Sequence, residues 1–227
     1  MKCVALLATL AYVGIAGAAD ADWPRYGGDD AKTRHSALRG INRANVGQLT
    51  LAWSYDTGEK GDTQTQPIVV GRTLYGYTPS HKTFALDATT GKPLWTFDSG
   101  IAGVGANRGL MYWKSGEDAR VFAAVDNFVY ALNAITGKPV TEFGQAGRID
   151  LRENLGRDAA SQSVRLTTPG VIYRDLMILG GRVSEGLPAS PGHVRAYDVR
   201  TGALRWTFRT IPQPGEPGYD TWPKDAW

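Results

Sequence analysis

The sequence has 227 residues, of which 42% are hydrophobic and 21% are charged, a balance typical of folded globular proteins and not of disordered ones. The formal net charge is only +3, and no Lys/Arg run or aromatic-interleaved basic stripe occurs, so we expect no nucleic-acid partner. The 28 glycines and 12 prolines, with no long amphipathic helical pattern, indicate a β protein with many turns.

The first 19 residues have the pattern of an export signal. Lys2 gives a basic start, an apolar stretch follows, and Ala-Gly-Ala-Ala comes just before Asp20. We predict that residues 1–19 are a cleaved secretory signal peptide, with a retained membrane anchor as the alternative. The only cysteine, Cys3, lies in this segment, so the mature protein is expected to have no disulfide and no cysteine metal site.

An eleven-residue motif occurs three times without gaps. The copies span residues 85–95, 131–141 and 196–206. In each copy an Asp or Asn ends a β-rich run, Thr-Gly closes a turn in which glycine accepts positive φ, and a second strand follows. Trp95 and Trp206 end two copies, where a flat ring can dock on a neighbouring unit. Thr141 ends the other copy and is expected to weaken that dock.

The repeat predicts an all-β fold, a β-propeller, with a generic β-sandwich as the alternative. Four short strands recur at a period of about 45 residues, which is the propeller signature. We expect about three four-stranded blades in residues 65–211, after an N-terminal segment, 20–64, whose residues 49–55 form a ring-closing strand. Residues 212–227 are interpreted as the start of a loop or of the next blade. Three blades cannot close a ring, so we expect a truncated chain.

The copy at 85–95 reads Ala-x-Asp-x-x-Thr-Gly-Lys-x-x-Trp, which resembles the tryptophan-docking motif of quinoprotein alcohol and glucose dehydrogenases. The stretches 23–28, 107–113 and 180–185 also resemble this family, in the same order. The chain is therefore identified as the N-terminal portion of a dehydrogenase that depends on pyrroloquinoline quinone (PQQ). The resemblance implies an eight-bladed propeller with PQQ near its axis and Ca²⁺ acting as a Lewis acid on the quinone.

The same resemblance implies candidate site residues. Arg108, in an Asn-Arg-Gly stretch, is expected to pair with a carboxylate of the cofactor. Gln64 and either Thr167 or Thr168 are further candidate cofactor contacts. Glu185 is the candidate Ca²⁺ ligand, because a carboxylate oxygen suits that ion. Each residue has an ordinary alternative role as a solvated or strand-edge side chain.

No catalytic residue is expected within the chain. The general-base Asp of the family would lie beyond Trp227, so the chain alone should be inactive. Val104 stands where the glucose-dehydrogenase branch has a His and the alcohol-dehydrogenase branch has adjacent cysteines, which leaves the substrate class open. His35, His81 and His193 share no catalytic or zinc spacing, and we expect ordinary surface or turn roles for them.

The predicted function is that of a periplasmic oxidoreductase. It would oxidise an alcohol or a sugar such as glucose and pass the electrons to a quinone or a cytochrome, with peripheral association with the membrane. The alternative is a non-enzymatic propeller scaffold of the cell envelope. Such a scaffold would carry a lipoprotein cysteine after the apolar core and lack the Asn-Arg-Gly stretch, and this sequence has the reverse of both features.

Overall fold

The computed structural model describes residues 22–224 and 226, so the predicted signal peptide lies outside the described residues. Within these residues nearly all regular structure is β, apart from three short 3₁₀ helices: η2 (Val46–Gln48), η3 (Ala159–Ser161) and η4 (Tyr219–Thr221). No helix in the described part of the chain is both long and apolar enough to cross a bilayer.

Three antiparallel sheets, here called the first, second and third blades, each contain four strands. The first blade consists of β1 (Ile68–Val70), β2 (Thr73–Tyr77), β3 (Thr83–Asp87) and β4 (Pro93–Phe97). The second blade consists of β5 (Met111–Ser115), β6 (Asp118–Val125), β7 (Phe128–Asn133) and β8 (Arg148–Asp150). The third blade consists of β10 (Val171–Tyr173), β11 (Leu176–Leu179), β13 (Val194–Asp198) and β14 (Leu204–Phe208).

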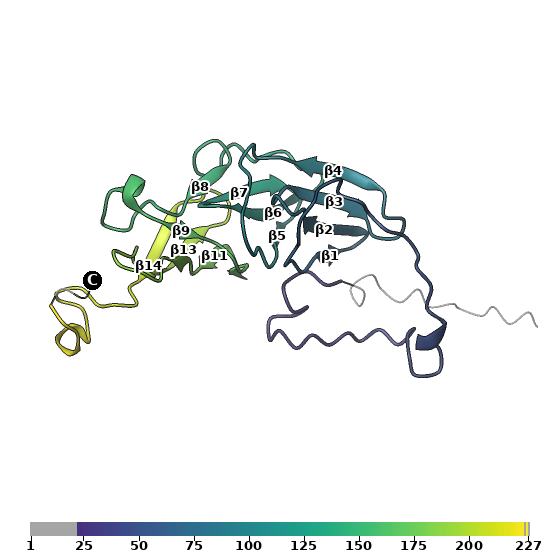
Figure 1. The fold of residues 1–227 in the computed structure, drawn as a ribbon, viewed down its shortest axis with the longest axis horizontal. Helices are drawn as coiled ribbons and strands as arrows, with labels where there is room; N and C mark the ends of the chain where they lie inside the picture. Colours follow the sequence, from purple (N-terminus) through teal and green to yellow (C-terminus); the bar gives the residue numbers. More distant parts are fainter. Residues whose placement is uncertain (1–21, 225, 227) are drawn as a thin grey trace, which may run out of the picture.

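A small additional sheet belongs to the insertions around the third blade. It pairs β9 (Val164–Arg165) with β12 (Arg182–Val183). The strand β12 lies between β11 and β13 in the sequence, and this inserted segment supplies part of the longer spacing of the third repeat copy. The three blades follow one another along an open arc (Figure 1). The predicted all-β propeller architecture with about three four-stranded blades is therefore confirmed.

The repeated turn is built in the same way in all three blades. In the first blade, the Oδ1 atom of Asp87 accepts hydrogen bonds from the backbone N–H groups of Thr89 and Thr90 and from the Thr90 hydroxyl. Asn133 and Asp198 accept the equivalent three hydrogen bonds in the other blades. The turn then needs a left-handed residue, which glycine supplies without steric cost, as Gly91 does with a φ of 71°.

The hydrophobic core lies between successive blades. In β6 the side chains alternate, so that Val121, Ala123 and Val125 face the first blade while Phe122 and Ala124 face the third. Both faces of the second blade are therefore buried, which is why residues 121–125 of β6 form a continuous apolar run.

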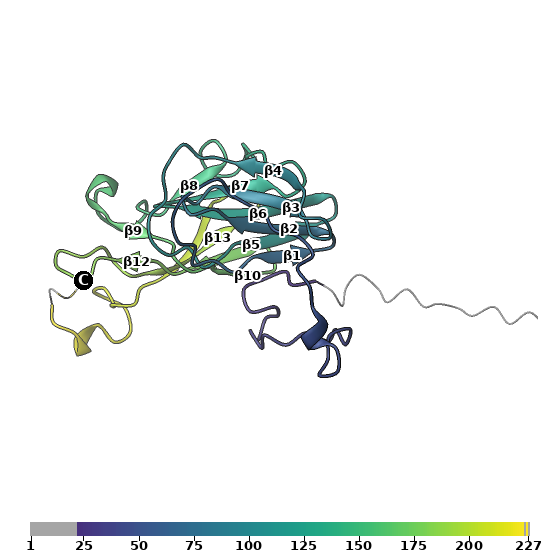
Figure 2. The same cartoon turned by 45° about the vertical axis from the view of Figure 1, so that its right-hand side comes forward.

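The first part of the N-terminal segment, residues 22–48, lies on the β1 side of the sheets in both views (Figures 1 and 2). Trp23 forms an antiparallel bridge with Val69 of β1. Residues 49–55 pair with no strand in the described part of the chain. Trp53, in this stretch, nevertheless docks on the first blade: its Nε1 donates to Ala88 O at 3.2 Å, and its ring covers Gly91.

Candidate cofactor site

The segments that enter the innermost strands of the three blades are joined by backbone hydrogen bonds. Gln66 N donates to Arg108 O at 3.2 Å, and Arg108 N donates to Thr167 O at 3.1 Å. Gln66 also forms a parallel bridge with Gly109. These residues precede β1, β5 and β10, the first strand of each blade, so the three entry segments form one continuous edge, here called the inner edge.

The three residues of the Asn-Arg-Gly stretch have different structural roles. Asn107 is buried, and its Nδ2 donates to Ala124 O of β6 at 2.8 Å, which anchors the stretch to the second blade. Gly109 has a φ of 152°, and a Cβ at this position would lie 3.2 Å from Gln66 O, so glycine allows the close backbone approach. Arg108 lies between these anchors with an exposed side chain.

The structure brings Arg108 and Thr167 together. The Nη1 atom of Arg108 donates to Thr167 O at 3.3 Å, which orients the guanidinium group. This bond uses one of five guanidinium N–H donors, and the exposed remainder can receive an anion in a forked geometry. Thr168 is exposed and follows directly. Gln64 is also exposed and lies two residues before Gln66.

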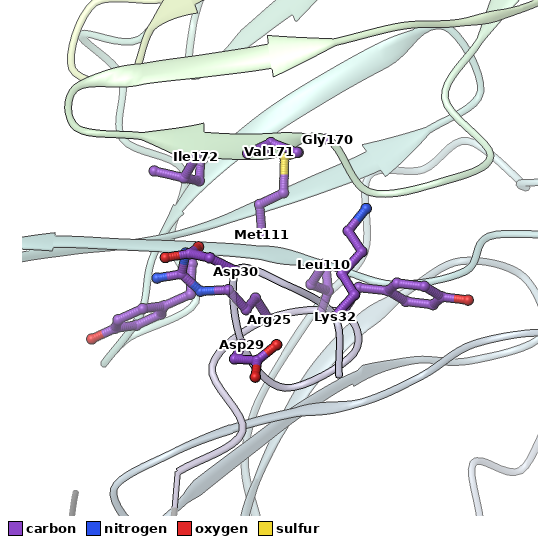
Figure 3. Close-up of a pocket in the computed structure, with 11 residues that line it drawn as sticks. Arg25, Asp29, Asp30, Lys32, Leu110, Met111, Gly170, Val171 and Ile172 are labelled. Atoms are coloured by element: carbon purple, nitrogen blue, oxygen red, sulfur yellow. The ribbon is translucent and has the colours of Figure 1, made fainter. Parts of the chain in front are cut away.

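A small cavity beneath the N-terminal segment is too small for an organic cofactor. It measures about 40 Å³ and lies between the N-terminal loop and the starts of β5 and β10. Figure 3 shows Arg25 and Asp29 from the loop on one side, with Met111 and Ile172 from the strands on the other. This volume has room for only a few water molecules.

A larger cavity of about 690 Å³ lies at the far end of the third blade. Its lining includes Arg157, His193 and Gln213, and none of the candidate site residues. Burial of the His193 ring lowers its pKa, with a further contribution from Arg209. His193 is 8% exposed, so the surface role expected for it is wrong, although the residue lies in a loop directly before β13.

The comparisons with known proteins identify the family. The family described as the PQQ "Glucose/ethanol/alcohol dehydrogenase, beta-propeller domain" matches residues 23–227. The chain belongs to this family. It is thus a PQQ-family β-propeller chain, as the repeat and the Asn-Arg-Gly stretch predict.

Several relatives of known name resemble this PQQ-family chain. Quinoprotein glucose dehydrogenase A of Acinetobacter calcoaceticus is 32% identical, and the match covers 86% of the chain and 29% of that relative. Quinohemoprotein alcohol dehydrogenase of Comamonas testosteroni is 33% identical over 213 residues, covering 88% and 27%. A crystal structure of the Comamonas enzyme superposes with a TM-score of 0.71 at 31% identity, covering 86% of the chain and 28% of that structure. The chain spans less than a third of the length of these relatives.

The inner edge of this PQQ-family chain fits a polycarboxylated quinone in its donor chemistry. Arg108 offers a guanidinium fork, Thr167 and Thr168 offer hydroxyl groups, and Gln64 offers an amide. All four groups can donate to carboxylate oxygens. The roles of Gln64, Thr167 and Thr168 as cofactor contacts remain predictions.

The described residues do not form a metal centre by themselves. No group of three or more His, Cys, Asp or Glu side chains in the described part of the chain is arranged to hold a metal ion. Glu185 is exposed and lies just beyond β12. Ca²⁺ takes six to eight oxygen ligands, and one exposed carboxylate cannot supply them. The role of Glu185 as a ligand therefore remains a prediction.

Sequence reasoning missed two residues that shape the site. His81 lies in the turn between β2 and β3, as expected, but it is 7% exposed and packs against the loop that leads to Arg108, so a surface role is wrong for it. Tyr77 accepts a hydrogen bond from Ala124 N at 2.6 Å, and burial raises the pKa of its phenol, which keeps it neutral. The paired glycines Gly103 and Gly105 were the available signal, because closely spaced glycines often mark close packing.

Proposed function

We propose that the chain is the N-terminal part of a PQQ-dependent dehydrogenase that oxidises an alcohol or a sugar such as glucose. The observation that carries this proposal is the contact between Arg108 and Thr167 at the inner edge of the blades. Relatives named as glucose and alcohol dehydrogenases support it. The names also include alcohol dehydrogenases described as quinone-type, which supports electron transfer to a quinone, with a cytochrome as the other acceptor.

In this proposal the residues of the chain bind and orient the cofactor. The guanidinium group of Arg108 pairs with a carboxylate of PQQ, while the bond to Thr167 O holds that group in place. The hydroxyls of Thr167 and Thr168 and the amide of Gln64 restrain the cofactor further. When bound, PQQ supplies the electron acceptor for the hydride of the substrate carbon.

Ca²⁺ is part of the proposal, with Glu185 as one oxygen ligand among several. Further oxygen ligands are required, because one carboxylate is too few. Removal of Ca²⁺ with a chelator is expected to abolish activity of the full-length enzyme, and added Ca²⁺ should restore it.

We likewise propose that the protein is exported to the periplasm, on the basis of the N-terminal pattern of residues 1–19.

We also propose that the chain is inactive by itself. It spans less than a third of its relatives, and it brings only one part of a cofactor site. An activity assay on the 227-residue chain tests this directly. Supplied with PQQ and Ca²⁺, the chain is expected to oxidise neither glucose nor ethanol, and turnover of either substrate contradicts the proposal.

The function itself is tested by dye-linked oxidation assays on the full-length protein. The apoprotein is supplied with PQQ and Ca²⁺ and offered glucose or ethanol with an artificial electron acceptor. Turnover that requires PQQ and falls at least about tenfold in Arg108→Ala supports the proposal. If neither substrate class is oxidised and PQQ does not bind, the protein is better described as a non-enzymatic envelope propeller.

A further inference from the structure

His81 connects the first blade to the loop that carries Arg108. It belongs to the hairpin loop 78–82 between β2 and β3, where its backbone has a φ of 66°. Its Nε2 lies 3.1 Å from Gly105 O. A carbonyl oxygen only accepts, so the ring carries a proton on Nε2 and donates it to this bond.

Gly103 provides the space for this imidazole ring. A Cβ atom on Gly103 would overlap the ring of His81. The backbone of Gly103 is not in the left-handed region, so the glycine is required for space and not for conformation. Gly103 N also donates to Ser80 O at 3.0 Å, which places the two loops edge to edge.

The hairpin loop that carries His81 is itself held firmly. Glu59 accepts hydrogen bonds from Ser80 N and Ser80 Oγ, both at 2.9 Å, and pairs with Lys82 at 3.4 Å. Burial alone would raise the pKa of Glu59, but these hydrogen bonds outweigh it and lower the pKa to about 2. The carboxylate is therefore ionised over the working pH range, and the hairpin presents His81 from a fixed base.

The loop 103–107 has one support at each end. His81 fixes its beginning through Gly103 and Gly105. Asn107 fixes its end through Ala124 O of β6. Two glycines in a short loop would otherwise leave many backbone conformations accessible, so the His81 contact removes the freedom that these glycines would bring.

We propose that His81 is a positioning residue for the cofactor site. It sets the path of the loop 103–107 and thereby the place from which Arg108 extends. Val104, at the top of this loop, is 60% exposed and is presented by the same contact. This inference rests on the proposed cofactor role of Arg108, while the loop contact itself does not depend on it.

Hydrogen exchange on the cofactor-free, full-length protein tests the loop contact. In His81→Asn the new residue accepts positive φ but is too short to reach Gly105 O. We expect the amides of Gly103 and Arg108 to exchange at least about tenfold faster, with β6 unchanged. His193→Asn is the matched control, because it makes the same change at an equally buried histidine outside this loop. Unchanged exchange at Gly103 and Arg108 in His81→Asn overturns the proposal.

Fluorescence titration with PQQ tests the link to the site. We expect His81→Asn to raise the Kd at least about tenfold, and His193→Asn to leave it within about twofold. Gly103→Ala should weaken binding similarly, because the new methyl group displaces the ring. The double variant of His81→Gly and Gly103→Ala lacks the ring that the methyl group would displace. Its increase in Kd should therefore be smaller than the product of the increases in the two single variants.

The two readouts separate the failure of this inference from the failure of the proposed function. Faster loop exchange with an unchanged Kd in His81→Asn overturns the positioning role and leaves the proposed function standing. If the wild-type protein does not bind PQQ, the proposed function is wrong, and the exchange data alone decide whether His81 supports the loop.

Discussion

The first and second blades join differently from the second and third. At the first junction, the ring of Trp95 covers Gly137 and its Nε1 donates to Ala134 O at 3.1 Å. At the second junction the equivalent position is Thr141, and the guanidinium group of Arg120 takes over the hydrogen bond: Nη1 donates to Val199 O at 3.1 Å.

At the second junction other residues also cover the turn glycine in place of an indole. Gly202 faces Ile149 and Gly144, and Gly144 N donates to Thr201 O at 2.9 Å. The carbonyl after the turn residue therefore accepts a hydrogen bond in every blade, from an indole twice and from a guanidinium once. Ala134 O also accepts one from Tyr75 Oη at 3.2 Å. The comparison teaches that the fold requires a donor to this carbonyl and a cover for the turn glycine, and not a particular residue type.

The largest effect is expected for Trp95→Ala. Loss of the ring over Gly137 and of the bond to Ala134 O should lower the free energy of unfolding by about 3 kcal/mol, measured by urea titration with circular dichroism. Trp206→Ala is the matched control, since this tryptophan holds the same motif position but is 41% exposed. We expect it to cost less than about 1 kcal/mol. Equal costs for the two changes would contradict the docking role of Trp95.

Arg120→Met should have the next largest effect. The change removes the donor to Val199 O and Arg200 O and leaves Asp118 without its partner. A cost of about 2 kcal/mol is expected in the same titration, because buried acceptors lose their hydrogen bonds. Arg72→Met removes an exposed ion pair and should cost less than about 0.5 kcal/mol. The interpretation of the second junction fails if both variants behave alike.

Asp198→Asn should have a smaller and pH-dependent effect. Burial would raise the pKa of Asp198, but hydrogen bonds from Arg205 and from the turn amides outweigh it and lower the pKa from 3.8 to about 2. A lowered folded-state pKa contributes stability that is present above about pH 4 and is lost as the pH falls through about 2.

The expected cost of Asp198→Asn at pH 7 is about 1 kcal/mol, since the half-exposed Arg205 is screened by solvent. Urea titrations at pH 7 and near pH 2 should show that the difference from wild type shrinks at the lower pH. Asn133 makes the same turn hydrogen bonds without a charge, so Asn133→Ala should cost the same at both values. A pH-independent cost for Asp198→Asn would rule out the charge effect.

The smallest effect is expected for Thr141→Trp. This change restores the motif of the other copies, but Ile149 and Gly144 already cover the face of Gly202. The added ring should therefore change the free energy of unfolding by less than about 0.5 kcal/mol. A stabilisation above about 1 kcal/mol would mean that the second junction has an unfilled dock.

The sequence predicted what depends on local pattern. Turn residues such as Asp87 and Gly91 set the hairpins wherever they occur, so the three blades followed from the repeat. The Asn-Arg-Gly stretch was visible in the same way, and its Arg108 lies at the inner edge as the family resemblance implies. The motif alone also predicted a weakened dock at Thr141, but it gave no sign that Arg120 supplies the missing donor there.

The remaining features depend on contacts between distant segments. The hydrogen bond from Arg120 to Val199 O joins residues 79 positions apart, and no periodic pattern in the sequence predicts it. The same holds for His81, whose burial depends on the space that Gly103 leaves in another loop. These contacts depend on how side chains of different blades pack together, and a single sequence does not show which distant residues come into contact.

Titration of PQQ into the full-length apoprotein, with wild type compared with Arg108→Ala, tests the central claim most directly. Arg174→Ala, at an exposed arginine in the hairpin turn between β10 and β11, is the control. A charge-assisted pair is worth about 1.5–3 kcal/mol, so Arg108→Ala should raise the Kd by about tenfold or more while Arg174→Ala leaves it unchanged. An unchanged Kd in Arg108→Ala would contradict the account.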